Sequence, residues 1–176
     1  MELMILDGIQ NLRTPIGDSL MRFVSTLGNA GVIWILLAIV LFMIPKTRKA
    51  GIFMVGALLA DVILCNGILK NLVARTRPFD VNTAIQLIVA KPKDFSFPSG
   101  HTAASFASVT ALFLAKEKKL AWPALVFAVT MAFSRMYLYV HYPTDILGGV
   151  LVGVLSGYLG KWCAKRISER YLKRIK

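Results

Sequence analysis

Histidine, cysteine and acidic residues are all scarce in this chain of 176 residues. It has two cysteines, two histidines and nine Asp or Glu residues, against 21 Lys or Arg residues. Both cysteines, Cys65 and Cys163, lie in apolar segments, so we expect buried free thiols and no disulfide. The histidines, His101 and His141, each lie in a short polar cluster, and any imidazole chemistry is confined to these two positions.

The remaining composition is that of a membrane protein. The chain is 56% hydrophobic with a mean hydropathy of +0.63, well above a soluble domain. The formal charge of +12 could suggest nucleic acid, but the basic residues stand at the ends of apolar segments, as membrane topology signals do. We therefore expect the lipid bilayer as a partner, no nucleic acid, and a single membrane-embedded domain over residues 1–176.

Five apolar segments approach the roughly 20 residues that cross a bilayer. They are residues 31–44, 51–73, 102–115, 122–139 and 146–164, of which the first and third must borrow neighbouring residues. Residues 1–26 differ, because apolar residues recur at helical spacing from Leu3 to Ile16 with polar ones between them. We interpret 1–26 as an amphipathic helix lying in the membrane interface, with a sixth membrane-inserted segment as the alternative. The predicted fold class is an all-α, polytopic membrane helix bundle.

No cleavable signal peptide is expected, because Glu2, Asp7 and Arg13 interrupt the first apolar residues. Basic residues gather in the loops 46–49 and 116–119 and in the tail 161–176. With five spans these three groups share one side, and the positive-inside bias makes that side cytoplasmic. The sequence thus predicts a multi-pass membrane protein with a cytoplasmic C-terminus.

The polar clusters fall on the other side. Lys70 and Arg77 follow the second span, His101 opens the third, and His141 follows the fourth. Two spans separate the histidines, so both emerge on one face, which the charge bias makes the outer or periplasmic face. An accidental scatter of His and Arg would have no reason to share a side.

His141 and Asp145 are separated by three residues. A carboxylate beside a histidine accepts its N–H and fixes the tautomer, which leaves the other ring nitrogen free to attack phosphorus. The alternative is that Asp145 caps the apolar helix that follows it. The two roles are compatible.

A second cluster surrounds His101, where Pro98 ends a loop and a helix begins near Gly100. A helix N-terminus offers free N–H groups to an anion, and the Ser99 hydroxyl is a further donor. His101 would then be the general acid that protonates the leaving oxygen. The alternative is an ordinary helix start with an exposed histidine.

The third cluster is cationic: Lys70, Arg77 and Arg135. Arg135 lies near the end of an apolar span, where a charge is costly and a functional hypothesis is the default. Guanidinium groups match phosphate oxygens, so these cations could replace a metal ion in phosphoryl transfer, and we expect neither metal nor cofactor. The alternatives are a snorkelling Lys70 and an Arg77 that contacts lipid phosphate.

Two intramembrane features have structural interpretations. Asp61 is expected to make a buried structural hydrogen bond. Gly149, Gly153 and Gly157 recur every four residues and are expected to let helices approach closely, within the chain or in an oligomer whose state the sequence does not predict.

Taken together, the clusters resemble the three-part signature of the type 2 phosphatidic acid phosphatase superfamily. Lys70 with Arg77-Pro78 matches the first motif, and Pro98-Ser99-Gly100-His101 matches the second. Ser134-Arg135, His141 and Asp145 match the third. Spacing and order agree at every defining position, over roughly residues 60 to 160.

This resemblance implies a six-helix core with an outward-facing site and metal-independent hydrolysis through a phosphohistidine. His141 would be the nucleophile, Asp145 its orienting partner and His101 the acid for the leaving group. The phosphate would be held by five residues: Lys70, Arg77, Ser99, Gly100 and Arg135. Soluble vanadium-dependent haloperoxidases share these motifs, but the five apolar spans argue against that branch.

The substrate expected at such a membrane face is a lipid phosphate. The short chain looks like the bacterial enzymes that convert undecaprenyl diphosphate into undecaprenyl phosphate for cell-wall synthesis. Phosphatidylglycerophosphate and phosphatidic acid remain alternatives, because the motifs recognise only the phosphate. A transporter or flippase is the alternative of another class, although no internal repeat supports it.

Overall fold

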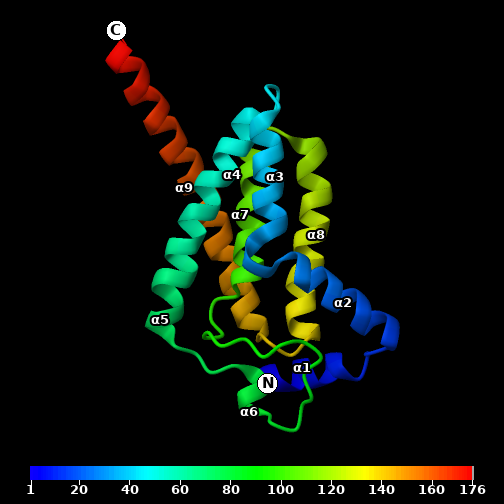
Figure 1. The fold of residues 1–176 in the computed structure, drawn as a ribbon. Coiled ribbons are helices and arrows are strands. Elements are labelled where there is room, and N and C mark those ends of the chain that lie inside the picture. Colours follow the sequence, from blue (N-terminus) through cyan, green and yellow to red (C-terminus); the bar gives the residue numbers. More distant parts are fainter. Residues whose placement is uncertain (176) are drawn as a thin grey trace.

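The computed structural model describes residues 1–175, and all regular secondary structure in this range is helical, without a β-strand (Figure 1). The elements are α1 (Glu2–Gln10), α2 (Pro15–Leu27), η1 (Asn29–Gly31), α3 (Val32–Met43), α4 (Arg48–Asp61), η2 (Val62–Leu69), α5 (Lys70–Val73), α6 (Pro78–Val81), α7 (Gly100–Leu114), α8 (Lys118–Tyr137) and α9 (Pro143–Ile175). The all-α class is confirmed. The predicted basic tail 161–176 coincides with the end of α9, and residue 176 lies outside the described residues.

The helices that could cross a membrane are fewer than the five predicted spans. Three are long and apolar enough by themselves: Arg48–Val81, Lys118–Tyr137 and Pro143–Ile167. A fourth is possible if α2 and α3, which meet at a 48° bend, count as one span. The other two predicted spans correspond to α3 with 12 residues and α7 with 15. At about 1.5 Å per residue, such helices are shorter than the roughly 30 Å hydrocarbon core.

The glycine stripe of α9 packs against α7, as predicted. A Cβ on Gly153 would lie 2.4 Å from the Ala103 carbonyl oxygen, and one on Gly149 would lie 2.8 Å from that of Ser99. Further along α9, a Cβ on Gly160 would lie 2.3 Å from the backbone nitrogen of Ala57 in α4. Small residues therefore let α9 contact both α7 and α4 at backbone distance.

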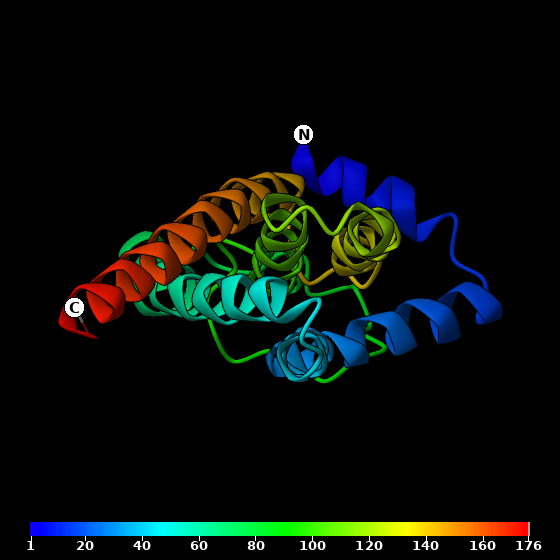
Figure 2. The same ribbon diagram turned by 90° about the horizontal axis from the view of Figure 1, so that it is seen from above.

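The N-terminal segment corrects the prediction of one amphipathic helix over 1–26. The structure has two helices, because the chain leaves helical geometry before Pro15, which opens α2 after the capping residue Thr14. Leu6 is fully buried against residues 137–142, with Leu3 and Ile9 beside it. The apolar face of α1 thus packs on protein and not on lipid. Seen from above, α1 and α2 pass on two sides of α8 (Figure 2).

The two ends of the bundle are built differently (Figure 1). The connections 44–47 and 115–117 lie at one end and are short. The longer connections 82–99 and 138–142 lie at the other end, together with α1 and α6. The α4–α5 helix reaches this second end through the π-helical η2, a form that is frequent at functional sites, and stops at Ala74 in a left-handed conformation with φ 47°.

Asp61 departs from its predicted role. It is 2% exposed at the end of α4, but its Oδ1 has no hydrogen-bond partner among the described residues. The structural hydrogen bond expected for this atom is not found.

Candidate active site

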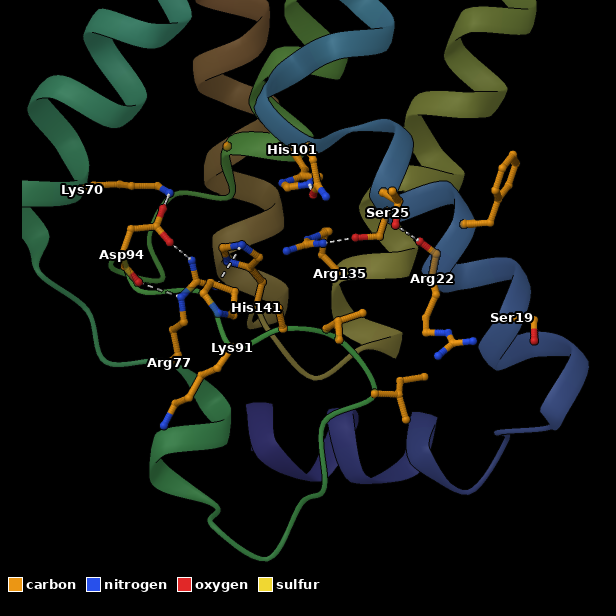
Figure 3. A pocket seen from close by; sticks show the side chains of 18 residues that line it. Ser19, Arg22, Ser25, Lys70, Arg77, Lys91, Asp94, His101, Arg135 and His141 are labelled. Carbon is orange, nitrogen blue, oxygen red and sulfur yellow. Dashed lines mark hydrogen bonds and ion pairs between the residues drawn. The ribbon is translucent and has the colours of Figure 1, made fainter.

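A cavity of about 730 Å³ lies at the end of the bundle that carries α1 and α6 (Figure 3). Six of the eight predicted site residues line it: Lys70, Arg77, Gly100, His101, Arg135 and His141. They come from three stretches of chain, residues 70–77, 100–101 and 135–141, so the predicted convergence is present. The other two, Ser99 and Asp145, are fully buried and do not line the cavity.

The Arg77 side chain is held in place by several hydrogen-bond acceptors. It is 3% exposed, and its Nη1 donates to the Val140 carbonyl at 2.7 Å while Nε donates to the Asp94 carbonyl at 2.8 Å. Nη1 also lies 3.3 Å from His141 Nε2. The guanidinium is therefore held in one orientation beside the imidazole, as a bidentate phosphate ligand must be.

Asp94 is a site residue that sequence reasoning missed. Its carboxylate bridges the two cations of the first motif, accepting from Arg77 Nη2 at 2.7 Å and pairing with Lys70 Nζ (Figure 3). Partial burial raises the pKa of Asp94, but the hydrogen bonds and charges of Lys70 and Arg77 outweigh it and lower the pKa to about 2. The carboxylate thus occupies a position among the cations that a phosphate oxygen would share. Its only signal in the sequence is that it is the one acid between Asp80 and His101.

His141 presents its two ring nitrogens to different groups. Nδ1 lies 3.5 Å from Asp145 Oδ2, outside hydrogen-bond geometry, and Nε2 faces Arg77. Burial, helped by the charges of Arg77 and Arg135, lowers the pKa of His141 to about 3 against the opposing effect of Asp145. The imidazole is therefore neutral near pH 7 and keeps a free lone pair.

Asp145 is held by three hydrogen bonds at the start of α9. Its Oδ2 accepts from Ser96 Oγ at 2.5 Å and from the Tyr142 backbone N–H at 2.9 Å, and its Oδ1 accepts from Arg75 Nη1 at 2.7 Å. The bond to Tyr142 is a helix cap made by an acid in the first turn. The capping role of Asp145 is thus present, and its role as the partner of His141 stays a prediction.

Arg75 extends this network to the N-terminal helix. Its Nη2 pairs with Glu2 Oε2 at 2.5 Å, and the guanidinium stacks 3.9 Å from the centroid of the Tyr142 ring. Sequence reasoning gave Arg75 no role. Its alternation with Arg77 on an extended segment was the available signal, since both side chains point back toward the bundle end.

The opposite wall of the cavity comes from α2 and η1. Arg135 Nη1 donates to Ser25 Oγ, and Arg135 Nε has no partner among the described residues. His101 Nε2 lies 3.1 Å from Asn29 Oδ1. Ser25 was missed because residues 1–26 were interpreted as a membrane-surface helix, and Asn29 was missed because it lies between that segment and the first predicted span.

The second motif is only partly turned toward the cavity. Gly100 lines it, and a Cβ there would lie 3.8 Å from Lys70 Nζ. The Ser99 hydroxyl instead accepts from Thr102 Oγ1 at 3.0 Å, and the Ser99 backbone N–H donates to the Asp145 carbonyl at 3.1 Å. Ser99 therefore joins α7 to α9, and its phosphate contact stays a prediction.

The arrangement as a whole surrounds an anion-sized space with fixed cations and two imidazoles. Among the described residues, no group of three or more His, Cys, Asp or Glu is placed to hold a metal ion. The positive charge at the cavity is supplied by Arg and Lys side chains. Such preorganised donors stabilise the charge that develops on a transferring phosphoryl group.

Known proteins share this sequence and architecture. Undecaprenyl-diphosphatase BcrC of Bacillus subtilis (strain 168) is 32% identical over 81% of this chain and 72% of its own length. Phosphatidylglycerophosphatase B of the same strain is 34% identical over 90% of this chain and 80% of its own length. The crystal structure of Aquifex aeolicus LpxE superposes with a TM-score of 0.78 at 26% identity, over 90% of this chain and 93% of that one.

The match to a known family covers the part of the chain that carries the three motifs. Residues 49–169 match the PAP2 superfamily, from the start of α4 to the second half of α9. This span includes all eight predicted site residues. The chain therefore belongs to the PAP2 superfamily and is a lipid phosphatase.

Proposed function

We propose that the chain hydrolyses a lipid phosphate without a metal ion, through a phosphohistidine formed on His141. The observation that carries the proposal is the 3.3 Å approach of His141 Nε2 to Arg77 Nη1, with Nδ1 directed at Asp145. One nitrogen of a neutral imidazole then faces the cations that would hold the phosphate, and the other faces a carboxylate.

In the first step, His141 Nε2 attacks phosphorus while the bond to the lipid oxygen breaks. His101 gives its proton to that oxygen, and the charge on the three remaining phosphoryl oxygens is balanced by Lys70, Arg77 and Arg135. Asp145 stabilises the N–H of the phosphorylated imidazole. The products of this step are the lipid that has lost one phosphoryl group and the phosphohistidine at position 141.

In the second step, water attacks the phosphorus and the P–N bond breaks. His101, now neutral, takes a proton from the water, and inorganic phosphate leaves. His141 returns to its neutral form. Asp94 must share Lys70 and Arg77 with the phosphate in both steps, so it limits how tightly the product is held.

The substrate we favour is undecaprenyl diphosphate, which would be converted to undecaprenyl phosphate and inorganic phosphate. The relative named undecaprenyl-diphosphatase supports this choice. Phosphatidylglycerophosphate is the second candidate, because the relative named phosphatidylglycerophosphatase B matches more of the chain. Phosphatidic acid is the third.

For the membrane arrangement, we propose that α3, α4–α5, α7, α8 and α9 each cross the bilayer of a bacterial inner membrane, with α1 and α2 at its outer face. The short α3 and α7 would be completed by the neighbouring η1 and by the loop before Ser99. The basic loops 46–49 and 116–119 lie at the bundle end opposite the cavity (Figure 1). The positive-inside bias then directs the cavity outward.

The chemistry is tested by phosphate release from the three candidate lipids in detergent with EDTA. The wild type should release phosphate, and His141→Ala should reduce release by about 10³-fold or more, since the residual rate comes from binding alone. Acid-quenched wild type should carry a phosphoryl group that His141→Ala lacks. Retained activity in the variant, or strict dependence on added divalent metal, would remove the phosphohistidine mechanism.

Sidedness is tested with two added cysteines, one at a time, in a Cys163→Ser background. This background is needed because Cys163 is exposed and not buried as predicted, whereas Cys65 is buried. Thr83→Cys lies on the cavity side and Lys119→Cys on the basic side, and both positions are exposed. An impermeant thiol reagent should label only position 83 in intact cells and both positions after lysis. Labelling of position 119 in intact cells would reverse the topology.

A further inference from the structure

The cavity extends beyond the residues of the three motifs, along one face of α2. Ser19, Arg22, Ser25, Thr26 and Asn29 all line it, at intervals of three or four residues that place them on the same side of α2 and of the turn after it. The adjoining side of α2 is apolar and exposed at Ile16 and Leu20, and the exposed Phe23 lies at the edge of the cavity. The helix therefore turns a polar face to the cavity and an apolar face outward.

This polar face contacts the reaction centre at two points. Ser25 accepts from Arg135, and Asn29 lies at hydrogen-bond distance from His101. Arg22 lies one turn before Ser25 and Thr26, about 5 Å along the helix axis. In Figure 3, Arg135 lies between His141 and Arg22, so Arg22 continues the line of cations away from the proposed nucleophile.

Arg22 has no carboxylate partner among the described residues, unlike most cations of the cavity. Lys70 and Arg77 pair with Asp94, and Lys91 pairs with Asp80 at 2.5 Å. The nearest acid on α2, Asp18, pairs with Arg13 at 2.7 Å. The guanidinium of Arg22 is thus an uncommitted donor on the side of the cavity that α2 lines.

Charge matching indicates what this donor would bind. The fixed cations Lys70, Arg77 and Arg135 less the carboxylate of Asp94 leave two positive charges, which balance one phosphate dianion, while the proton of His101 passes to the leaving oxygen. A lipid diphosphate carries a second phosphate on the leaving oxygen, next to His101, and brings further negative charge. Arg22 supplies the matching positive charge on that side.

We propose that Arg22, on the polar face of α2, binds the second phosphate of a lipid diphosphate and makes the chain prefer diphosphates to phosphate monoesters. The inference rests on the proposed phosphatase function and specifies its substrate class. Undecaprenyl diphosphate satisfies it, and phosphatidic acid does not.

The test compares the wild type with Arg22→Gln and with Lys93→Gln, which removes an exposed positive charge outside the cavity at the same bundle end. Each is assayed with undecaprenyl diphosphate and with phosphatidic acid in the same detergent with EDTA. Arg22→Gln should lower kcat/KM for the diphosphate about 10- to 100-fold, as loss of a charge-assisted bond does, and change that for phosphatidic acid less than about twofold. Lys93→Gln should change neither.

Inhibition by inorganic ions gives a second readout that is independent of the lipid. Pyrophosphate should inhibit the wild type more strongly than phosphate, and Arg22→Gln should narrow that difference by a similar factor. Equal losses on both lipids, or no loss on the diphosphate, would overturn the role of Arg22. A wild type active only on phosphatidic acid would also overturn it and leave the phosphatase mechanism standing, whereas activity on neither lipid would overturn the proposed function itself.

Discussion

The two ends of the helix bundle carry similar residue types in opposite environments. At the end with loops 44–47 and 115–117, the basic residues Lys46, Arg48, Lys49, Lys116, Lys118 and Lys119 are all exposed. At the cavity end, Lys70, Arg77 and Arg135 are buried. Every ion pair between described residues lies at the cavity end.

The comparison shows at which end of the bundle charged side chains have lost hydration by burial. An exposed lysine keeps its hydration and contributes little to stability, so it serves topology. A buried arginine loses hydration and must regain it through fixed acceptors, as Arg77 does with two carbonyls and a carboxylate. The cavity end is therefore organised around an anion, and the basic end is not.

The largest contrast is expected from neutralising one cation at each end. Arg77→Gln should lower kcat/KM by about 10³-fold, because it removes a preorganised donor to the phosphoryl oxygens. Lys119→Gln, at the basic end, should leave kcat/KM unchanged. Arg77→Lys should recover little, since an ammonium cannot replace the fork that contacts both Asp94 and Val140. A value for Arg77→Gln within tenfold of the wild type would contradict the assignment.

A smaller effect is expected from a residue that acts through Asp145. Arg75→Gln removes the donor to Asp145 Oδ1 and the pair with Glu2, so kcat should fall about 10-fold while KM changes little. Arg48→Gln is the matched change at the basic end, where Arg48 donates to the Phe42 carbonyl, and should not alter kcat. If Arg75→Gln changed KM alone, Arg75 would be a substrate contact and not a positioning residue.

The buried histidine at the cavity end should make the stability of the protein depend on pH. His141 has its pKa lowered to about 3 in the folded protein, against about 6.5 when unfolded, so between these values the unfolded chain binds more protons. Stability from this group is complete above pH 6.5 and is lost as pH falls toward 3, at up to about 1.4 kcal/mol per pH unit. Thermal unfolding in detergent from pH 6.5 to 4.5 should show this slope, and His141→Asn should flatten it. An unchanged slope in the variant would assign it to other groups.

The smallest effect concerns the backbone and should be alike at both ends. Ala74 ends α5 with φ 47°, and Lys116 follows α7 with φ 71°. An L-residue other than glycine in the left-handed conformation costs roughly 1–2 kcal/mol. Replacing it by glycine removes this cost, but part of the gain is lost because glycine has a higher conformational entropy in the unfolded state. Ala74→Gly and Lys116→Gly should therefore each raise the free energy of unfolding by about 0.5–1 kcal/mol. Only Ala74→Gly should also lower kcat, because the turn at Ala74 directs Arg75 and Arg77.

Much of the site was predictable because its residues stand in short segments at span ends. Parity of the spans was enough to bring Lys70, Arg77, His101 and His141 to one face. The network behind them was not predictable in this way. Asp94 lies in a long connection, and Glu2 and Ser25 lie in a segment interpreted as a surface helix.

The fold prediction failed where length and packing decided. Apolar composition identified the segments that became α3 and α7, but it did not fix their lengths of 12 and 15 residues. The apolar stripe of residues 3–9 could face lipid or protein equally well. Its burial depends on the aromatic segment 137–142, which lies more than a hundred residues away.

By itself, the sequence determined which residue types are available for chemistry and predicted that they gather on one side of the bundle, because residue types and the order of apolar segments are local properties of the chain. Only the tertiary structure decided which acids and hydroxyls hold those groups in place, since Asp94, Arg75 and Ser25 find their partners through contacts between distant segments. Hydrogen bonds act over about 3 Å, and no spacing in a sequence fixes such distances across a bundle.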